Sequence, residues 1–369
     1  MVRISSRLTG FWSLIFMACA VLTGSARAAA PTQAPAYPSL EEPSPPAVKL
    51  ATVPLIAITR AGNRLVAGGA HGVIIYSDDN GAHWTQAHVP VSVTITDIAF
   101  ATPQDGWAVG AYGVVLHTTD GGKSWVRQIT GIEVNKLMLA NAQKVAAAAP
   151  GQPSSQLAVR RANIFMAAGP DKPFLSIDAQ SPQKVTVFGA YRMCVSSDDA
   201  GKNWQDCSLA VPDPISHNLY GATVDGGTVY IAAEVGHMFT MNQADGSFTA
   251  LTSPGTTTLF GTVLAKDGAL VAYGVAGAAY LSTDGGQTWT TLNMPTQSDI
   301  TGGLRLTSGA IVLITEAGGL LVSTDNGQSF APLGQNMGEA LCAAVQAANG
   351  DLVLAGLSGI RVVPKTALK

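Results

Sequence analysis

Five short segments of the sequence combine a hydroxyl, a carboxylate, glycine and an aromatic ring, a set of groups that could form a small active site. Residues 282–289 read STDGGQTW, and the five copies share the pattern Ser/Thr-x-Asp-x-Gly-x-x-Trp/Phe. The copies begin at residues 77, 118, 197, 282 and 323. A motif used five times in one chain is more typical of a repeated fold element than of a single catalytic site.

The aromatic residues that close the motif are regularly spaced. A sixth, worn copy ends at Phe248, so the closing residues are Trp84, Trp125, Trp204, Phe248, Trp289 and Phe330. Their intervals are 41, 79, 44, 41 and 41 residues, and such a period indicates a repeat architecture. We expect each motif aspartate to accept hydrogen bonds from N–H groups of its own turn, on the outer rim of the fold. These aspartates are Asp79, Asp120, Asp199, Asp284 and Asp325.

Each repeat contains four short β segments. In one unit, apolar strands at residues 259–264 and 269–273 are followed by a Gly-containing turn, a third strand that runs into the motif, and a weaker fourth strand. Four strands in about 40 residues are typical of a propeller blade. Gly-turns near residues 72, 113, 192, 236, 277, 318 and 359 mark seven units. The pattern predicts an all-β, seven-bladed β-propeller over residues 47–369.

Two segments depart from the repeat. Residues 131–172 are rich in alanine, lack the motif and end near Gly169-Pro170, which predicts a helical hairpin inserted between blades two and three. The last unit lacks a fourth strand. We expect the segment from Ala47 to Val53 to supply that strand, so that an N-terminal strand closes the ring.

The N-terminus has the organisation of a secretory signal peptide. Arg3 and Arg7 precede an apolar run from Phe11 to Leu22 that is too short to span a bilayer, and residues 25–28 (SARA) offer a cleavage site after Ala28. Cys19 lies in the run, but the preceding residues 16–18 (FMA) do not fit a lipoprotein site. We expect residues 1–28 to be a signal peptide, residues 29–46 to be an extended Pro-rich linker, and the mature chain to be periplasmic without spanning the membrane.

The charge of the mature chain argues against nucleic acid as a partner. Cleavage leaves 18 basic and 24 acidic side chains, a net charge of −6, whereas nucleic-acid-binding domains are basic.

The motifs resemble those of a known family. Residues 96–100 (TDIAF), 106–110 (GWAVG) and 119–125 (TDGGKSW) are similar to the photosystem II stability/assembly factor-like family of BNR or Asp-box propellers. The resemblance implies a seven-bladed propeller that acts as an assembly factor for a membrane-associated protein complex and is not an enzyme. Its known members carry a basic patch that contacts the client, and this chain is poor in arginine.

The alternative is a sialidase- or xyloglucanase-like glycoside hydrolase, or a glycan-binding propeller, because the same box occurs in such proteins. A glycosidase needs two carboxylates across a cleft, and the candidates outside the boxes are Asp97, Asp299, Glu234 and Glu316. Asp97 and Asp299 both open first strands at equivalent repeat positions, which favours a structural role. The six histidines have no metal-ligand spacing. We therefore expect no catalytic residues, no metal and no cofactor.

Partner binding is expected at the turns between second and third strands, which surround one mouth of a propeller channel. These turns differ between blades, and aromatic and arginine side chains are favoured at protein interfaces. The candidates are His71, Tyr112, Tyr191, Arg192 and Glu234, together with Arg160 and Arg161 of the inserted hairpin. We expect a monomer that binds a membrane-associated protein or complex.

Three cysteines follow the signal peptide. Cys194 and Cys207 flank a predicted hairpin and either form a disulfide or are two small buried residues. Cys342 lies in an apolar strand and is expected in the core.

Overall fold

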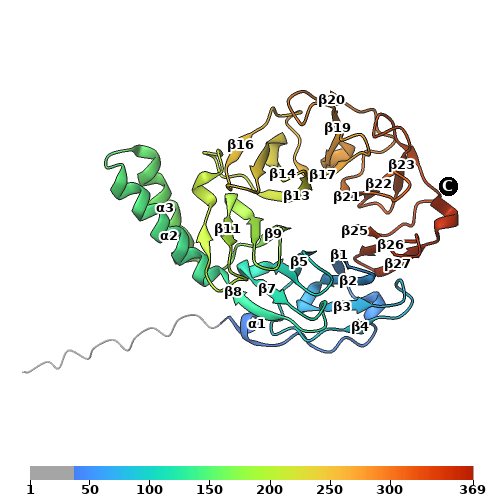
Figure 1. Cartoon of the computed structure of the whole chain (residues 1–369), viewed down its shortest axis with the longest axis horizontal. Coiled ribbons are helices and arrows are strands. Elements are labelled where there is room, and N and C mark those ends of the chain that lie inside the picture. Colours follow the sequence, from blue (N-terminus) through green and yellow to red (C-terminus); the bar gives the residue numbers. More distant parts are fainter. Residues whose placement is uncertain (1–36, 369) are drawn as a thin grey trace, which may run out of the picture. The chain divides into compact units, whose positions relative to one another are not determined.

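The computed structural model describes residues 37–368, which form a ring of seven antiparallel sheets (Figure 1). This confirms the predicted seven-bladed propeller. The predicted signal peptide and residues 29–36 of the predicted linker lie outside the described residues.

The strands of each blade follow one another in the sheet in the order of the sequence, with the first strand innermost (Figure 1). Blades one to three are β1 Leu55–Ala61, β2 Arg64–Gly69, β3 Ile74–Ser77, β4 Thr85–Gln86; β5 Ile95–Phe100, β6 Gly106–Gly110, β7 Val115–Thr118, β8 Val126–Ile129; β9 Phe174–Ala179, β10 Val185–Gly189, β11 Cys194–Ser197, β12 Gln205–Asp206. Blades four and five are β13 Leu219–Asp225, β14 Thr228–Ala233, β15 Met238–Asn242, β16 Phe248–Ala250; β17 Leu259–Leu264, β18 Leu270–Gly274, β19 Ala279–Ser282, β20 Thr290–Thr291. Blades six and seven are β21 Ile300–Arg305, β22 Ile311–Thr315, β23 Leu320–Ser323, β24 Ala331–Pro332; β25 Leu341–Gln346, β26 Leu352–Gly356, β27 Gly359–Val363.

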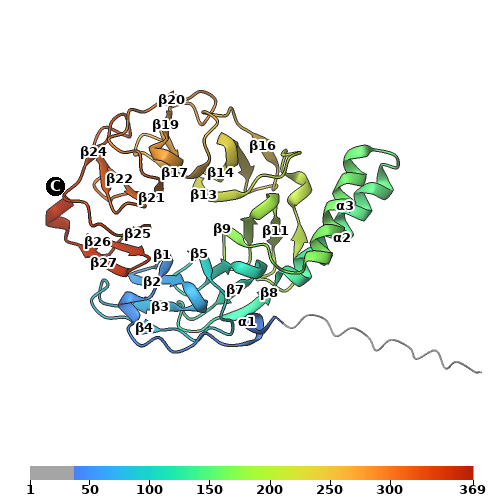
Figure 2. The ribbon, with the colours of Figure 1, turned by 180° about the vertical axis from the view of Figure 1, so that it is seen from behind.

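The core is divided into seven clusters of buried side chains, one between each pair of neighbouring blades. Each blade is therefore covered on both faces, and a strand covered on both faces is apolar throughout instead of alternating. Strand β22 (IVLIT) and strand β26 (LVLAG) are buried along their whole length for this reason. The reverse view shows the same closed arrangement (Figure 2).

Every first strand carries a bulge near its start, which the sequence pattern did not reveal. The register shifts between Leu55 and Ala57 in β1 and between Ile300 and Gly302 in β21, and the other five blades show the same irregularity. Bulges bend a strand and increase its twist. Here they occur where the first strands begin to line the channel.

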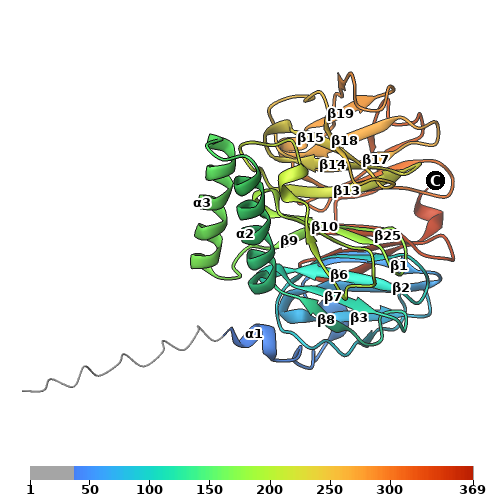
Figure 3. The same ribbon diagram turned by 60° about the vertical axis from the view of Figure 1, so that its left-hand side comes forward.

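The predicted helical insertion is confirmed. Helix α2 (Gly131–Ala148) and helix α3 (Pro153–Ala168) form a hairpin between blades two and three, beside the outer strands of blade three (Figure 3). The Thr130 side chain caps α2, and Glu133 reaches back to the Thr130 N–H in a capping box. Pro153 opens α3 at a position where its missing N–H costs nothing, and Gly169 ends it with a left-handed φ of 80°.

Closure of the ring differs from the prediction. Blade seven has three strands, and the segment from Ala47 to Val53 forms no fourth one. A turn of 3-10 helix at Leu50–Thr52 contacts β27 instead, and the Thr52 N–H and hydroxyl both bond to the carbonyl of Lys49. These donors are engaged within the turn and cannot pair with β27. Blades seven and one are held together by a shared apolar cluster, against which Ala47 and Val53 pack.

Part of the predicted linker is also structured, so the prediction of an extended tether is wrong for residues 37–46. Helix α1 (Pro38–Glu41) buries Leu40 in the cluster between blades one and two. The Ser44 N–H bonds to the carbonyl of Val89, and the Arg127 guanidinium donates to the carbonyl of Leu40. One apolar side chain and a few backbone bonds fix this Pro-rich segment, and composition does not reveal either.

Candidate functional site

The Asp-containing motif forms the turn between third and fourth strands. Asp284 accepts hydrogen bonds at Oδ1 from the Ser282 hydroxyl (2.8 Å) and the Thr288 N–H (2.9 Å), and at Oδ2 from the Thr288 hydroxyl (2.6 Å). The Thr288 hydroxyl and N–H, followed by the Ser282 hydroxyl, lower the pKa of Asp284 to about 2. The carboxylate bonds within its own turn, and equivalent bonds surround Asp79, Asp120, Asp199 and Asp325.

The aromatic residues that close the motif pack between blades. The Trp84 indole N–H donates to the carbonyl of Gly81 (3.0 Å), and Trp125 and Trp204 make the same bond within their own turns. Trp289 instead donates to the carbonyl of Thr252, before blade five. Trp84, Trp125, Trp204, Trp289 and Phe330 each lie in or against one of the clusters between blades. The motif that resembles an active site is thereby accounted for as a structural turn.

The turns between second and third strands lie on the opposite face of the ring, because successive strands alternate in direction. Five of them are single turns of 3-10 helix that touch the first strand of the next blade, near the channel mouth. The central residue of each is not glycine and has a left-handed φ between 54° and 59°. These central residues are His71, Tyr112, Tyr191, Val235 and Ala276.

The backbone locks these turns in place. The N–H of Val235 donates to the Thr258 hydroxyl, and the N–H of Ala276 donates to Asp299 Oδ1 (2.7 Å). Both acceptors lie just before the first strand of the next blade. The last residue of β18, Gly274, is needed for close approach, because a Cβ there would lie 2.1 Å from the carbonyl oxygen of Thr258. The turns are rigid supports for the side chains at their centres.

The side chains at these turns have different surroundings. His71 is exposed. Tyr191 is 53% exposed, although the centroid of its ring lies 5.8 Å from that of Phe165 in α3. Tyr112 is half-buried against Tyr37. The Glu234 carboxylate accepts from the N–H and side chain of Asn218, so it is held within the protein.

The exposed residue in the turn of blade four is Val235, at 49%, and not Glu234. Leu357, at 55%, is exposed in the corresponding turn of blade seven. Val235 occupies the repeat position of the predicted candidates His71 and Tyr191, and Leu357 occupies that of Glu234. Alignment of the turns on their closing glycines would have selected Val235 from the sequence, whereas a search for charged residues selected its neighbour. Four of the exposed residues of this face, His71, Tyr191, Val235 and Leu357, are named the mouth set; Ala276, Glu316, Ala317 and Ser358 are exposed there as well.

The three predicted arginine candidates lie at the inserted hairpin. Arg160 is exposed on α3, and Arg161 donates to the Ser216 hydroxyl. Arg192 is half-buried and donates to the carbonyls of Val211 and Asp213.

The channel is lined by the first strands, with small residues such as Gly221, Gly302 and Ala343. Asp97 is the only carboxylate among the residues that line the cavity of about 240 Å³ between the first strands, whereas Glu234 and Glu316 lie in the turns at the channel mouth. Burial raises the pKa of Asp97 to about 6, opposed by the N–H groups of Ile98 and Ile177 that bond to its oxygens. The predicted equivalence with Asp299 is wrong, because Asp97 is the third residue of β5 and Asp299 precedes β21.

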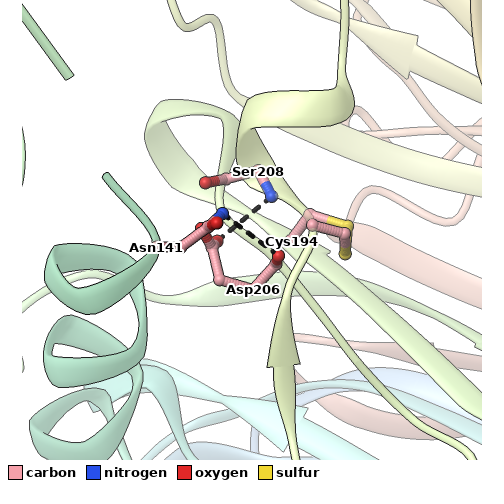
Figure 4. The surroundings of a disulfide bond; sticks show 5 residues. Asn141, Cys194, Asp206 and Ser208 are labelled. Atoms are coloured by element: carbon pink, nitrogen blue, oxygen red, sulfur yellow. Dashed lines mark hydrogen bonds between the residues drawn. A yellow bond between two sulfur atoms is a disulfide. The ribbon is translucent and has the colours of Figure 1, made fainter. Parts of the chain in front are cut away.

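Cys194 and Cys207 form a disulfide with a Cα–Cα distance of 5.0 Å, joining the third strand of blade three to the residue that follows its fourth strand (Figure 4). Asp206, beside the bridge, accepts from the Asn141 side chain of α2 (2.7 Å) and the Ser208 N–H (3.1 Å). The bridge therefore lies where the hairpin meets the ring. Cys342 is a free, partly buried cysteine in β25.

Residues 37–368 contain no cluster of three or more histidine, cysteine, aspartate or glutamate side chains placed to hold a metal ion. Within the same range, the helices are too short or too polar to cross a membrane.

Sequence comparison identifies relatives of the chain. A family model described as photosynthesis system II assembly factor YCF48 matches residues 76–146 and 165–339, more than half of the chain. The photosystem II assembly lipoprotein Ycf48 of Synechococcus sp. (strain CC9902) is 32% identical over 121 residues, 31% of this chain and 35% of that protein. The match thus spans about a third of that relative's length.

Solved structures with the same fold include YCF48 bound to D1 peptide, with a TM-score of 0.62 and 17% identity over 85% of this chain and 94% of that one. YCF48 from Cyanidioschyzon merolae gives 0.61 and 12%, covering 87% and 97%. The WD40 propeller domain of Doa1 gives 0.60 and 10%, covering 89% and 98%. At these identities the structures establish a shared propeller fold. Through the sequence match, the chain belongs to the photosynthesis system II assembly factor YCF48 family.

Proposed function

We propose that the protein is a non-catalytic, monomeric periplasmic factor that binds a segment of a membrane-associated protein complex through the face formed by the mouth set. One observation carries the proposal: Tyr191 and Val235 are held exposed at left-handed turn centres.

The conformation of these residues is costly. A left-handed residue other than glycine is uncommon, and for a β-branched side chain such as Val235 it is an outlier. Glycine would adopt this conformation without strain. An apolar side chain stands at this strained position and is half exposed to water. Strained positions concentrate at functional sites, so we infer that the side chain itself has a function.

The apolar character of the mouth set suits a protein partner. Tyr191, Val235 and Leu357 are large side chains more exposed than is usual for their type, and aromatic and apolar residues form the centres of protein interfaces. Known relatives are named as photosystem II assembly factors, and one is solved with a D1 peptide. A peptide segment of a membrane protein is therefore the class of partner that we propose.

Export to the periplasm is supported by the disulfide and by the predicted signal peptide at residues 1–28. Disulfides persist in oxidising compartments, and Cys194–Cys207 would be stable there. The Synechococcus relative is named a lipoprotein, whereas residues 16–18 do not fit a lipid attachment site at Cys19. The mass of the mature chain purified from membranes distinguishes cleavage after Ala28 from lipidation at Cys19.

A non-catalytic role is supported by the channel. Glycoside hydrolysis needs two carboxylates about 5–10 Å apart, and the cavity between the first strands is lined by one carboxylate, Asp97, whose oxygens already accept from the N–H groups of Ile98 and Ile177.

The test is a crosslinking pull-down from native membranes of the host with the mature chain, identified by mass spectrometry. The test variant is His71→Ala/Val235→Ala. The control is Val224→Ala, since Val224 is 45% exposed and lies at the other end of the same blade. One dominant membrane-protein partner, lost in the double variant and kept in the control, is expected. If the partner were captured by both variants, the interface would lie outside the mouth set. If no partner were captured, the proposal would be refuted, and the next experiments would be a glycan array and a glycosidase panel.

A further inference from the structure

A groove of about 500 Å³ runs between helix α3 and residues 207–218, which connect β12 to β13. Its apolar walls are formed by Val145, Leu157, Leu209, Val211, Pro212 and Pro214. The Cys194–Cys207 bridge fixes the start of one wall. Asp213 fixes the loop further on, since its carboxylate accepts from the N–H groups of Ile215, Ser216 and His217.

Arg192 lies in this groove at an unusual backbone position. It is the last residue of the Gly-turn of blade three, where the other six blades have Gly72, Gly113, Gly236, Gly277, Gly318 and Gly359. All seven residues have a left-handed φ, and that of Arg192 is 63°. An L-residue is strained there and glycine is not. Among the seven turns, arginine replaces glycine only at the turn that faces the groove.

The Arg192 guanidinium has only neutral partners. It donates to the carbonyls of Val211 and Asp213, and its Nε is buried without a hydrogen-bond partner. Burial, and then the neighbouring charge of Arg161, lower the pKa of Arg192. A buried donor without a partner is costly and marks a place where an acceptor is missing.

Arg161 adds a second positive charge to the groove, and it donates to the Ser216 hydroxyl and the carbonyl of Ile215. Among the described residues, neither Arg161 nor Arg192 forms an ion pair. The Asp213 carboxylate also lines the groove, and its charge acts on Arg192, but its oxygens are already bonded to backbone N–H groups and to the ring of His217 (3.0 Å). The groove therefore holds two guanidinium groups against one carboxylate, and neither guanidinium is ion-paired with it.

The whole hairpin is basic in a chain that is acidic. Residues 131–170 contain Lys136, Lys144, Arg160 and Arg161 against one carboxylate, Glu133, which is engaged in the capping box of α2, whereas the full chain has a net charge of −3. Most of α3 also lies outside the residues that match the family model, which resume at residue 165. The α3 wall of the groove, with Arg161, therefore lies outside the matched residues, whereas Arg192 lies inside them.

From these observations we infer that the groove binds an extended, acidic peptide segment of a protein partner, with one carboxylate between Arg161 and Arg192 and apolar side chains against the flanking walls. The groove adjoins the mouth set at Tyr191 but is lined by none of its four residues, and it rests on the proposed function only in that the partner is a protein. A recessed pair of guanidinium groups between apolar walls suits a narrow chain with one carboxylate, because guanidinium–carboxylate bonds are strong and directional. A bilayer surface would instead meet the outer, exposed side of the hairpin.

The test is selection of a random decapeptide library, displayed on phage, against the immobilised mature chain. Acidic residues flanked by apolar ones should be enriched at one position relative to the unselected library. A fluorescein-labelled copy of the dominant peptide, and its Asp→Asn or Glu→Gln counterpart, are then titrated by fluorescence anisotropy. We expect the neutral counterpart to bind at least tenfold more weakly.

Three variants locate the binding. Arg161→Gln removes one charge from the groove, and Arg192→Gly restores the turn sequence of the other blades, so that folding is preserved. Both substitutions should weaken binding of the acidic peptide at least tenfold. Arg160→Gln removes the same charge from the adjacent, exposed position and should change binding less than twofold.

Several results would overturn the inference. These are selection without acidic enrichment, equal binding of acidic and neutral peptides, or equal effects of Arg160→Gln and Arg161→Gln. Selected peptides that depend on Val235 and not on Arg161 would overturn it while supporting the proposed function. Binding of the chain to vesicles of anionic phospholipid, reduced by Arg161→Gln, with no peptide selected, would assign the groove to a membrane surface instead.

Discussion

The left-handed turn of blade four makes a prediction about the order of two substitutions. At Val235, with φ 55° and ψ 32°, Val235→Gly should be more stable than Val235→Ala. The left-handed conformation costs an L-residue about 1–2 kcal/mol, and glycine loses about 0.5–1 kcal/mol more backbone entropy on folding. The difference between these two costs makes the glycine variant more stable than the alanine variant by about 0.5–1 kcal/mol. Since Val235 is half exposed, loss of its side chain removes about 1 kcal/mol of burial, so Val235→Gly should lie within about 1 kcal/mol of the parent.

The assay is urea denaturation of the mature parent, Val235→Gly and Val235→Ala, with the same pair at Val224 as a matched control. Val224 lies in strand β13, where glycine is less stable than alanine by about 0.5–1 kcal/mol. The order of the two substitutions should therefore invert between the two positions of one blade. If alanine were more stable than glycine at both positions, the left-handed conformation of Val235 would be refuted. A loss above about 2 kcal/mol in Val235→Gly would mean that the side chain is a packing element, not a binding residue.

Three further predictions concern stability. The pKa of Asp284 is lowered to about 2, so its stabilising contribution is present above about pH 4 and is lost as the pH falls from 4 to 2. The difference in free energy of unfolding between the parent and Asp284→Asn, measured by urea denaturation, should therefore narrow over this range. A constant difference would contradict the proposed hydrogen bonding. Replacement of Cys194 and Cys207 by alanine should lower the free energy of unfolding by about 3 kcal/mol, as expected for a short closed loop; an unchanged urea midpoint would indicate that the bridge does not form. Leu40→Ala should cost about 2–5 kcal/mol because the side chain is buried between blades one and two; a change below about 0.5 kcal/mol would mean that residues 37–46 are a free linker after all.

The sequence could predict the propeller because the same short unit recurs with a period near 41 residues, and each copy carries its own turn chemistry. The hairpin was predictable because residues 131–172 change abruptly from strand to helix composition. The ring closure was not, since the segment before Pro54 can form either a strand or a turn, and the hydrogen bonds of Thr52 decide between them. Nor was the burial of Leu40, which depends on contacts with blades far along the chain.

The site was predictable only at the level of the turns. Their place on one face follows from strand order, so residues such as His71 and Tyr191 could be selected. Whether a side chain points outward or bonds inward depends on backbone φ and on the neighbouring segments. For this reason Val235 is exposed, whereas its neighbour Glu234 accepts a hydrogen bond from Asn218. The role of Arg192 depends on the hairpin that covers it, and its replacement of a repeated glycine was the available sequence indication.

The most direct test of the binding face is site-specific photocrosslinking in native membranes of the host. A photoreactive p-benzoylphenylalanine is placed at Val235, at Leu357 or at Val224, each about half exposed, and adducts are identified by mass spectrometry. The proposed function predicts an adduct with the same membrane protein from positions 235 and 357 and none from position 224. Adducts from position 224 alone, or equal adducts from all three positions, would contradict it.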